Sequence, residues 1–158
     1  MEGAFITAKF RDFFTRDPGK SKRRPKMISV YLETSALLRM IFAEKEAPLV
    51  EKKIRTASRV VTSRLTRLET ERAIIRLAFD KPDTIKVIPL MERELGMLWP
   101  KIDFIEITKE ICELAARIAP KSRLRTLDAI HLATFLYLKK FDPKIEILTY
   151  DERLVSEL

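Results

Sequence analysis

Four acidic residues stand where a carboxylate is unusual, and their chemistry could define a site. Glu33 and Asp151 each follow directly on a short β-prone run. Glu69 falls near the centre of the apolar stripe of an expected helix, and Asp128 lies in the first turn of a helix that is otherwise almost wholly apolar. A buried carboxylate is costly unless another group pairs with it. The sequence therefore predicts that these acids have partners.

Each acid taken singly has a structural explanation. Asp128 and Asp151 suit helix N-termini, where the helix macrodipole favours negative charge by about 0.3–1 kcal/mol. Glu69 could pair with an arginine on its own helix, and Glu33 could cap the helix that follows it. Together they favour a shared site, because strand ends and helix starts gather at one edge of a parallel α/β sheet. Carboxylates gathered there repel one another, and a hard divalent cation such as Mg²⁺ or Mn²⁺ relieves that repulsion.

The elements that must position these acids alternate between strands and helices. β-prone runs predict the strands, and apolar residues at helical spacing predict the helices between them. The predicted strands span residues 28–32, 59–62, 103–107 and 145–149. This alternation is typical of an α/β fold with a central parallel sheet and helices on both faces.

The helix that carries Glu69, from about residue 63 to 79, has a predicted inward face. At 100° per residue this face holds four large apolar residues: Leu65, Leu68, Ile75 and Phe79. Ile74 and Leu77 fall on the opposite side of the helix, where we expect a candidate contact for another subunit.

Composition excludes several classes of site. A single cysteine, Cys112, allows no intrachain disulfide and no cysteine-rich zinc site, and its helical context predicts a small buried residue. The single histidine, His131, excludes sites built from several imidazoles, and we interpret it as a satisfied helix residue rather than a ligand or base. No apolar run approaches the ~20 residues of a transmembrane helix, and no signal-peptide core is present at the N-terminus. We expect a cytoplasmic protein without stable membrane insertion.

The charge of the chain is concentrated at its start. The formal charge is +8 and the pI about 9.7, which suits a polyanionic partner, but residues 1–26 alone contribute +5. We predict a basic, phenylalanine-containing tail over residues 1–26 and one domain over residues 27–158. Three interpretations of the tail remain open: a poorly ordered segment, an arm that binds nucleic acid or a membrane surface, or a stretch that precedes a true start at Met27.

A basic loop precedes the helix of Asp128. Its cationic residues Lys121, Arg123 and Arg125 could hold the phosphates of a nucleic acid beside that acid, or could form an ordinary solvated loop. Both interpretations stay open at the level of sequence.

Four segments give the chain a family resemblance. They are YLETSALL at 31–38, LTRLETERA at 65–73, LRTLDAIHLA at 124–133 and ILTYDERL at 147–154. In this order and spacing the chain resembles the PIN-domain ribonucleases, most closely the VapC-type toxins of toxin–antitoxin pairs. The resemblance covers residues 27–158.

The resemblance implies a three-layer α/β/α fold and an Mg²⁺- or Mn²⁺-dependent endoribonuclease that leaves a 5′-phosphate and a 3′-hydroxyl. It also implies an antitoxin partner and a homodimer. By residue, Glu33, Asp128 and Asp151 match the metal-holding acids and Glu69 the helix acid that orients a water. Thr149 matches the hydroxyl that accompanies the last acid.

The chain departs from the family pattern at Glu33, where the family normally has Asp. The longer side chain carries its carboxylate further into the site, which could shift or weaken the metal. The alternative function is therefore a PIN-like module that binds RNA or a protein with weak or no catalysis. Cleavage of RNA with Mg²⁺ or Mn²⁺ separates the two functions.

Overall fold

The computed structural model describes residues 28–120 and 124–158. The predicted tail over residues 1–26 lies outside the described residues, as do Lys121 and Arg123 of the basic loop. No helix in the described ranges is long and apolar enough to cross a membrane.

A parallel sheet forms the centre of the domain. Its strands are β1 (Ser29–Leu32), β2 (Arg59–Ser63), β3 (Asp103–Ile105) and β4 (Glu146–Leu148). Every pairing is parallel, in the order β3-β2-β1-β4, and Val30 of β1 lies opposite Val60 on one side and Glu146 on the other. The α/β fold with a central parallel sheet is confirmed, with β3 and β4 shorter than predicted.

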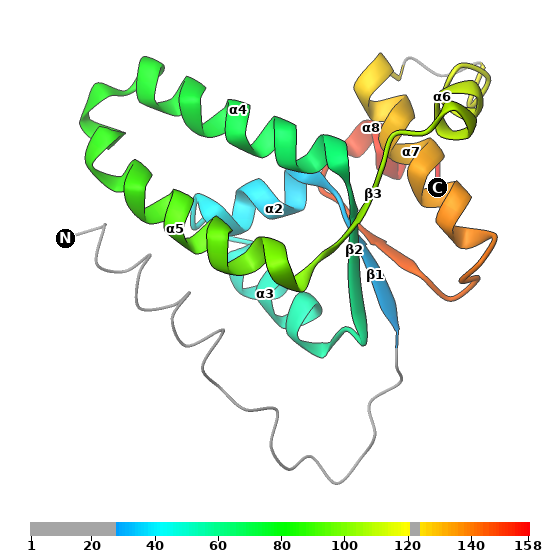
Figure 1. The fold of residues 1–158 in the computed structure, drawn as a ribbon, viewed down its shortest axis with the longest axis horizontal. Coiled ribbons are helices and arrows are strands. Elements are labelled where there is room, and N and C mark those ends of the chain that lie inside the picture. The colour runs from blue at the N-terminus through cyan, green and yellow to red at the C-terminus, as the bar shows by residue number, and fades with distance from the viewer. Residues whose placement is uncertain (1–27, 121–123) are drawn as a thin grey trace, which may run out of the picture.

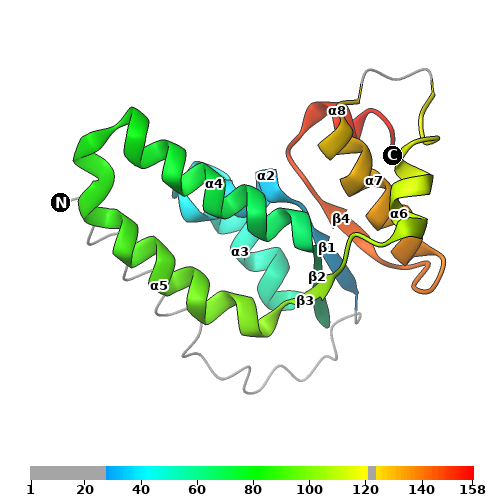
Figure 2. The ribbon, with the colours of Figure 1, turned by 45° about the horizontal axis from the view of Figure 1, so that its top comes forward.

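Helices cover both faces of this sheet (Figure 1). The α-helices are α2 (Thr34–Ile41), α3 (Ala47–Thr56), α4 (Arg64–Asp80), α5 (Ile88–Leu98), α6 (Lys109–Ala115), α7 (Thr126–Lys139) and α8 (Glu152–Val155). Two 3₁₀ turns, η1 (Pro82–Val87) and η2 (Trp99–Lys101), flank α5. Helices α2 to α5 lie on one side and α6 and α7 on the other, while α4 and α5 reach away from the sheet as a long hairpin (Figure 2).

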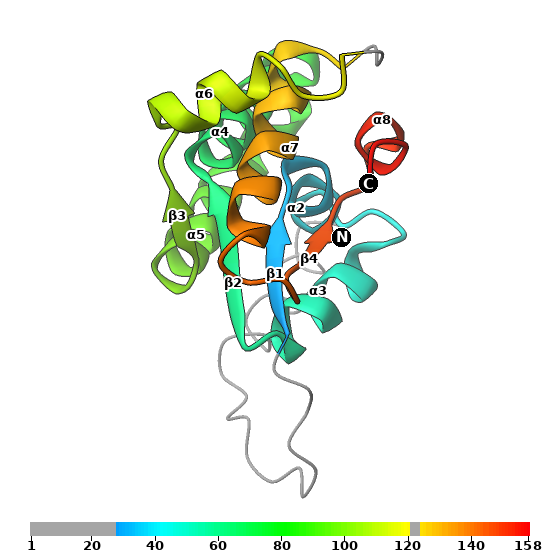
Figure 3. The same cartoon turned by 90° about the vertical axis from the view of Figure 1, so that its right-hand side faces the viewer.

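The alternation of side chains along β1 separates two cores. Leu32 packs into the larger core with residues of α2 to α5, whereas Tyr31 faces the other way, against Phe135 of α7 and Ile145. Successive strand residues point to opposite faces, so neighbours in β1 serve both layers. Seen from the side, the strands end at the edge where α2 begins (Figure 3).

The predicted inward face of α4 is wrong for three of its four residues. Leu65 is buried, but Leu68, Ile75 and Phe79 are 57%, 55% and 86% exposed. Ile74, predicted to face outward, is only 3% exposed.

The error has its reason in the residues that α4 buries, which form a row along one side of the helix. Thr66, Thr70 and Ile74 follow one another at intervals of four, and both threonines are fully buried. The Thr70 hydroxyl donates to the carbonyl of Thr66 at 2.7 Å, which satisfies it within the helix. Thr70 can therefore face a neighbour in place of a larger apolar residue, whereas the buried Thr66 hydroxyl has no hydrogen-bond partner within the described residues. Cys112 is a second error, because it is exposed rather than buried.

Candidate active site at the carboxyl ends of the strands

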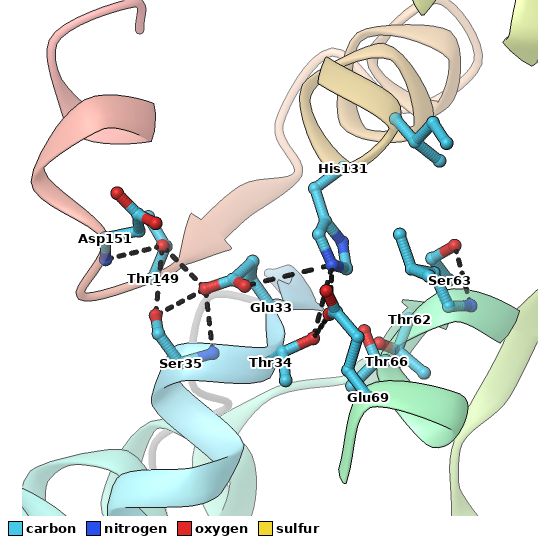
Figure 4. Close-up of polar contacts among 12 residues, drawn as sticks. Glu33, Thr34, Ser35, Thr62, Ser63, Thr66, Glu69, His131, Thr149 and Asp151 are labelled. Atoms are coloured by element: carbon cyan, nitrogen blue, oxygen red, sulfur yellow. Dashed lines mark hydrogen bonds and ion pairs between the residues drawn. The ribbon is translucent and has the colours of Figure 1, made fainter. Parts of the chain in front are cut away.

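Glu33 is the residue that joins β1 to α2. Its backbone is extended and its carboxylate caps the helix, accepting the Ser35 N–H at 2.9 Å on Oε2. The same oxygen accepts from the Ser35 hydroxyl and, at 2.8 Å, from the Thr149 hydroxyl. The side chain is buried, and only Oε1 of the carboxylate is left to face the rest of the site (Figure 4).

Glu69 reaches the same place from α4. Its Oε2 accepts from the Thr34 hydroxyl and lies 2.8 Å from Nε2 of His131. Burial alone would raise the pKa of the Glu69 carboxyl, but the hydrogen bonds from His131 and Thr34 outweigh it, so this pKa lies below its ordinary value. Like Glu33, Glu69 has one oxygen held by donors, and no hydrogen bond to its Oε1 is seen within the described residues.

His131 connects the two acids to the interior of the protein. It lies on α7, is 2% exposed, and its Nε2 is 3.9 Å from Oε1 of Glu33. On the other side of the ring, Nδ1 lies 2.9 Å from the hydroxyl of the fully buried Tyr31. The sequence predicts a satisfied helix residue, and the structure adds that the partners of His131 are the acids of the site.

Asp128 and Asp151 form a second pair beside the first. Asp151 caps α8, and Asp128 accepts the backbone N–H of Arg125 at 3.2 Å. The guanidinium of Arg153 lies between them, 3.3 Å from Asp151 and 3.6 Å from Asp128. This arginine partly balances two of the four negative charges.

Thr149 links the second pair to the first. Its hydroxyl oxygen accepts the Asp151 N–H at 3.1 Å while the hydroxyl donates to Glu33. All four acids thus lie at one edge of the sheet, but the structure divides them into two sets. Glu33 and Glu69 form a tight group with His131, and Asp128 and Asp151 form an adjacent pair. Arg125, at the start of α7, is exposed beside Asp128.

The donor set of the tight group suits a divalent cation. Glu33, Glu69 and His131 each present one ligand atom, and these atoms lie within 4.8 Å of one another. Carboxylate oxygens are the preferred ligands of Mg²⁺ and Mn²⁺, whereas imidazole suits softer metals. Glu33 and Glu69 each bring a carboxylate oxygen to this group, and these oxygens fit such an ion. Asp128 and Asp151 lie outside this group of three.

Sequence reasoning missed three residues of this network, which are Tyr31, Thr34 and Ser35, and it missed the role of His131. Thr34 and Ser35 directly follow Glu33, and His131 follows Asp128 by one helical turn. This proximity to the acids is the signal that could have identified three of them. Tyr31 carries no such signal, because it reads as an ordinary strand residue.

Comparison with known proteins agrees with this fold. A family model described as PIN domain matches residues 30–156. Ribonuclease VapC35 of Mycobacterium tuberculosis is 36% identical over 127 residues, covering 79% of this chain and 86% of the relative. Ribonuclease VapC46 of the same organism is 33% identical over 128 residues, covering 81% and 88%.

Solved structures give the same picture of the fold. A toxin–antitoxin complex from Klebsiella pneumoniae superposes with a TM-score of 0.55 at 18% identity, covering 77% of this chain and 86% of that one. Mycobacterium tuberculosis VapC20, described as a Sarcin-Ricin loop cleaving toxin, gives 0.52 at 13% identity, covering 82% and 96%. On the match of its sequence to the family model and to the VapC ribonucleases, the chain belongs to the PIN domain family.

Proposed function

We propose that this protein is a metal-dependent endoribonuclease of the VapC toxin type, which hydrolyses phosphodiester bonds of RNA. The observation that carries the proposal is the pair of carboxylates, Glu33 and Glu69, each with one oxygen held by donors and the other without a hydrogen bond within the described residues. Such an arrangement spends hydrogen bonds to keep two anions close together, which is costly unless a cation joins them. The likeness to ribonucleases of the VapC group supports the same activity.

The proposed metal is Mg²⁺ or Mn²⁺, held by carboxylates of Glu33, Asp128 and Asp151, some of them through water, with Glu69 alongside. A bound ion of this kind supplies a more acidic water and positive charge to offset that of the phosphate. Glu69 would orient the attacking water through its free oxygen. Thr149 would hold Glu33 in place.

The proposed substrate contacts are basic residues close to these acids. Arg125 presents an exposed guanidinium at the N-terminus of α7, one turn from Asp128. Lys121 and Arg123, which precede it in sequence, would extend this contact along the RNA phosphates. Phosphate contacts of this kind fix the position of the RNA without reading its sequence.

The proposed partners are an antitoxin protein and a second copy of the chain. The relevant surface on α4 is the apolar row formed by Leu68, Ile75 and Phe79, all more than half exposed. Three large apolar side chains aligned along one helix are typical of a contact surface. This row replaces the contact predicted from Ile74 and Leu77, since Ile74 lies in the core.

The test is RNA cleavage with Mg²⁺ or Mn²⁺, comparing the parent protein with Asp128→Asn. We expect metal-dependent cleavage by the parent and none by the variant. Glu71→Gln is a matched control, because it also removes one negative charge, but at an exposed site on α4 that is paired with Arg67. Cleavage that survives in a folded Asp128→Asn variant, or that needs no metal, would contradict the proposal.

A second function is favoured by one specific observation. Glu33 stands where the family normally has Asp, and its Oε2 is already saturated by three donors from Ser35 and Thr149. An acid held in this way could belong to a module that binds RNA or a protein without cleaving. Substitutions at position 33 separate this function from the first.

A further inference from the structure

We propose that His131 is a positioning residue rather than a metal ligand: its Nε2–H donates to Glu69 and holds that carboxylate, while Tyr31 fixes the ring from the other side. The inference rests on the proposed nuclease function for its catalytic consequence. Its structural content, which is the position of one proton, can be measured without any cleavage.

The geometry commits both nitrogens of the ring. Nδ1 of His131 lies 2.9 Å from the Tyr31 hydroxyl, and Nε2 lies 2.8 Å from Oε2 of Glu69. The three side chains come from β1, α7 and α4. Their contacts therefore link a strand of the sheet to one helix on each of its faces. His131 and Tyr31 are both almost completely buried, so the ring itself is shielded from water.

The donors and acceptors in this chain can be assigned from chemistry. An ionised carboxylate only accepts hydrogen bonds, so the proton of the 2.8 Å contact between Nε2 and Oε2 of Glu69 belongs to Nε2. The fully buried Tyr31 hydroxyl lies 2.9 Å from Nδ1, and a tyrosine hydroxyl carries its hydrogen at neutral pH, so it can donate to that nitrogen. In the neutral ring, Nδ1 then accepts from Tyr31.

This assignment leaves His131 without a lone pair on the side of the ring that faces the two acids. A nitrogen that carries hydrogen cannot bind a cation, and Nδ1, which could, faces Tyr31 in the interior. Hard cations of the proposed kind also prefer oxygen to imidazole. His131 therefore acts through Glu69. Together with the Thr34 hydroxyl it holds Oε2 of Glu69, which leaves Oε1 of Glu69 for the site.

The chain offers an unusually clean measurement, because His131 is its only histidine. Selective ¹⁵N-histidine labelling gives one pair of ring resonances. We expect Nε2 to carry hydrogen both without and with saturating Mg²⁺. If Mg²⁺ removes the hydrogen from Nε2, or if the ring is found with hydrogen on Nδ1 alone, the proposal is overturned and His131 is free to be a ligand.

Two substitutions test the positioning role. His131→Gln keeps an N–H donor near the position of Nε2 but no imidazole, so we expect it to retain far more cleavage than His131→Ala, whose loss should be about 10–100-fold. Equal losses in folded Gln and Ala variants would overturn the proposal. Tyr31→Phe should shift the ring resonances and lower cleavage, whereas Tyr137→Phe, a control on α7 whose ring packs on Phe141, should change neither.

The outcomes separate this inference from the proposed function. If no RNA is cleaved under any condition while Nε2 keeps its hydrogen, the proposed function fails and the assignment of His131 stands. If cleavage is metal-dependent while Mg²⁺ displaces the Nε2 hydrogen, the function stands and this inference fails. Unchanged ring resonances in Tyr31→Phe would remove Tyr31 from the proposal.

Discussion

Replacing Glu33 with Asp and with Gln distinguishes a nuclease from a binding module at the residue where the chain departs from its family. Glu33→Asp keeps the charge and the helix cap, since Asp is a good N-cap residue. It withdraws the carboxylate by one C–C bond, about 1.5 Å. Glu33→Gln keeps the length and removes the charge. The two variants therefore separate position from charge at one backbone site.

The size of the expected effect on cleavage follows from geometry. Mg²⁺ requires its oxygen ligands at about 2.0–2.1 Å in a near-ideal octahedron, and an error of ~1 Å in catalytic geometry costs on the order of 10²-fold. If the longer Glu side chain displaces the metal, Glu33→Asp should retain or increase cleavage. Glu33→Gln should lose most of it, because one oxygen of the amide cannot replace an anionic ligand.

The free energy of unfolding of Glu33→Gln should differ little from that of the parent, so a loss of cleavage in this variant would not reflect a loss of fold. Ligand atoms of Glu33 and Glu69 lie within 4.8 Å of each other. At an effective dielectric of about 20, relief of their repulsion is about 3 kcal/mol before solvent screening at the partly exposed Glu69 reduces it. Against this, three hydrogen bonds to Oε2 lose a charged acceptor, at about 1 kcal/mol each. The terms nearly cancel, and the metal-free melting temperature should stay within about 5 °C.

The assay compares the parent with both variants by initial rates of RNA cleavage, by Mg²⁺ or Mn²⁺ affinity and by thermal melting. Glu71→Gln on α4 is the charge-matched control and should behave as the parent. Equal metal affinity and no cleavage for Glu, Asp and Gln at position 33 would refute the catalytic reasoning. The binding module would then be the better description of the protein.

Three further substitutions test other parts of the structure. Asp128→Asn should abolish cleavage but change the melting temperature by only a few degrees. Asn can still accept the backbone hydrogen bond, and the partly exposed contact with Arg153 is worth about 0.2–1 kcal/mol. A large loss of stability would contradict this expectation. Both carboxylate oxygens of Glu94 are buried without a partner in the described ranges, and burial raises the pKa of Glu94 above its ordinary 4.5. The stability contributed by the protonated Glu94 carboxyl is therefore complete below that value and is lost as the pH rises through the folded-state pKa. In urea unfolding, Glu94→Gln should be more stabilising at neutral pH than at acidic pH. An equal effect at both pH values would refute this. Phe79→Asp should lower the mass seen in sedimentation if the apolar row on α4 joins two copies, whereas Phe141→Asp, at a 72% exposed control site, should not.

Long-range contacts decided the parts of the site that the sequence left open. Tyr31 and His131 are 100 residues apart and His131 and Glu69 are 62 apart, yet each pair is within hydrogen-bond distance. No local pattern encodes such a meeting. It depends on where β1, α4 and α7 are packed, and this also decided that Arg153 lies between Asp128 and Asp151.

The sequence by itself determined the order of strands and helices, the parallel sheet and the edge where the four acids meet. The elements follow from periodicity, which acts over short stretches of chain, and the shared edge follows from the general rule that strands joined by helices run parallel and end together. Only the tertiary structure decided the rotation of α4 about its axis. Each residue turns a helix by about 100°, so a face is selected by the fit against neighbours rather than by apolarity alone. Small threonines at Thr66 and Thr70 fit that contact, and the larger Leu68 and Phe79 were left outside.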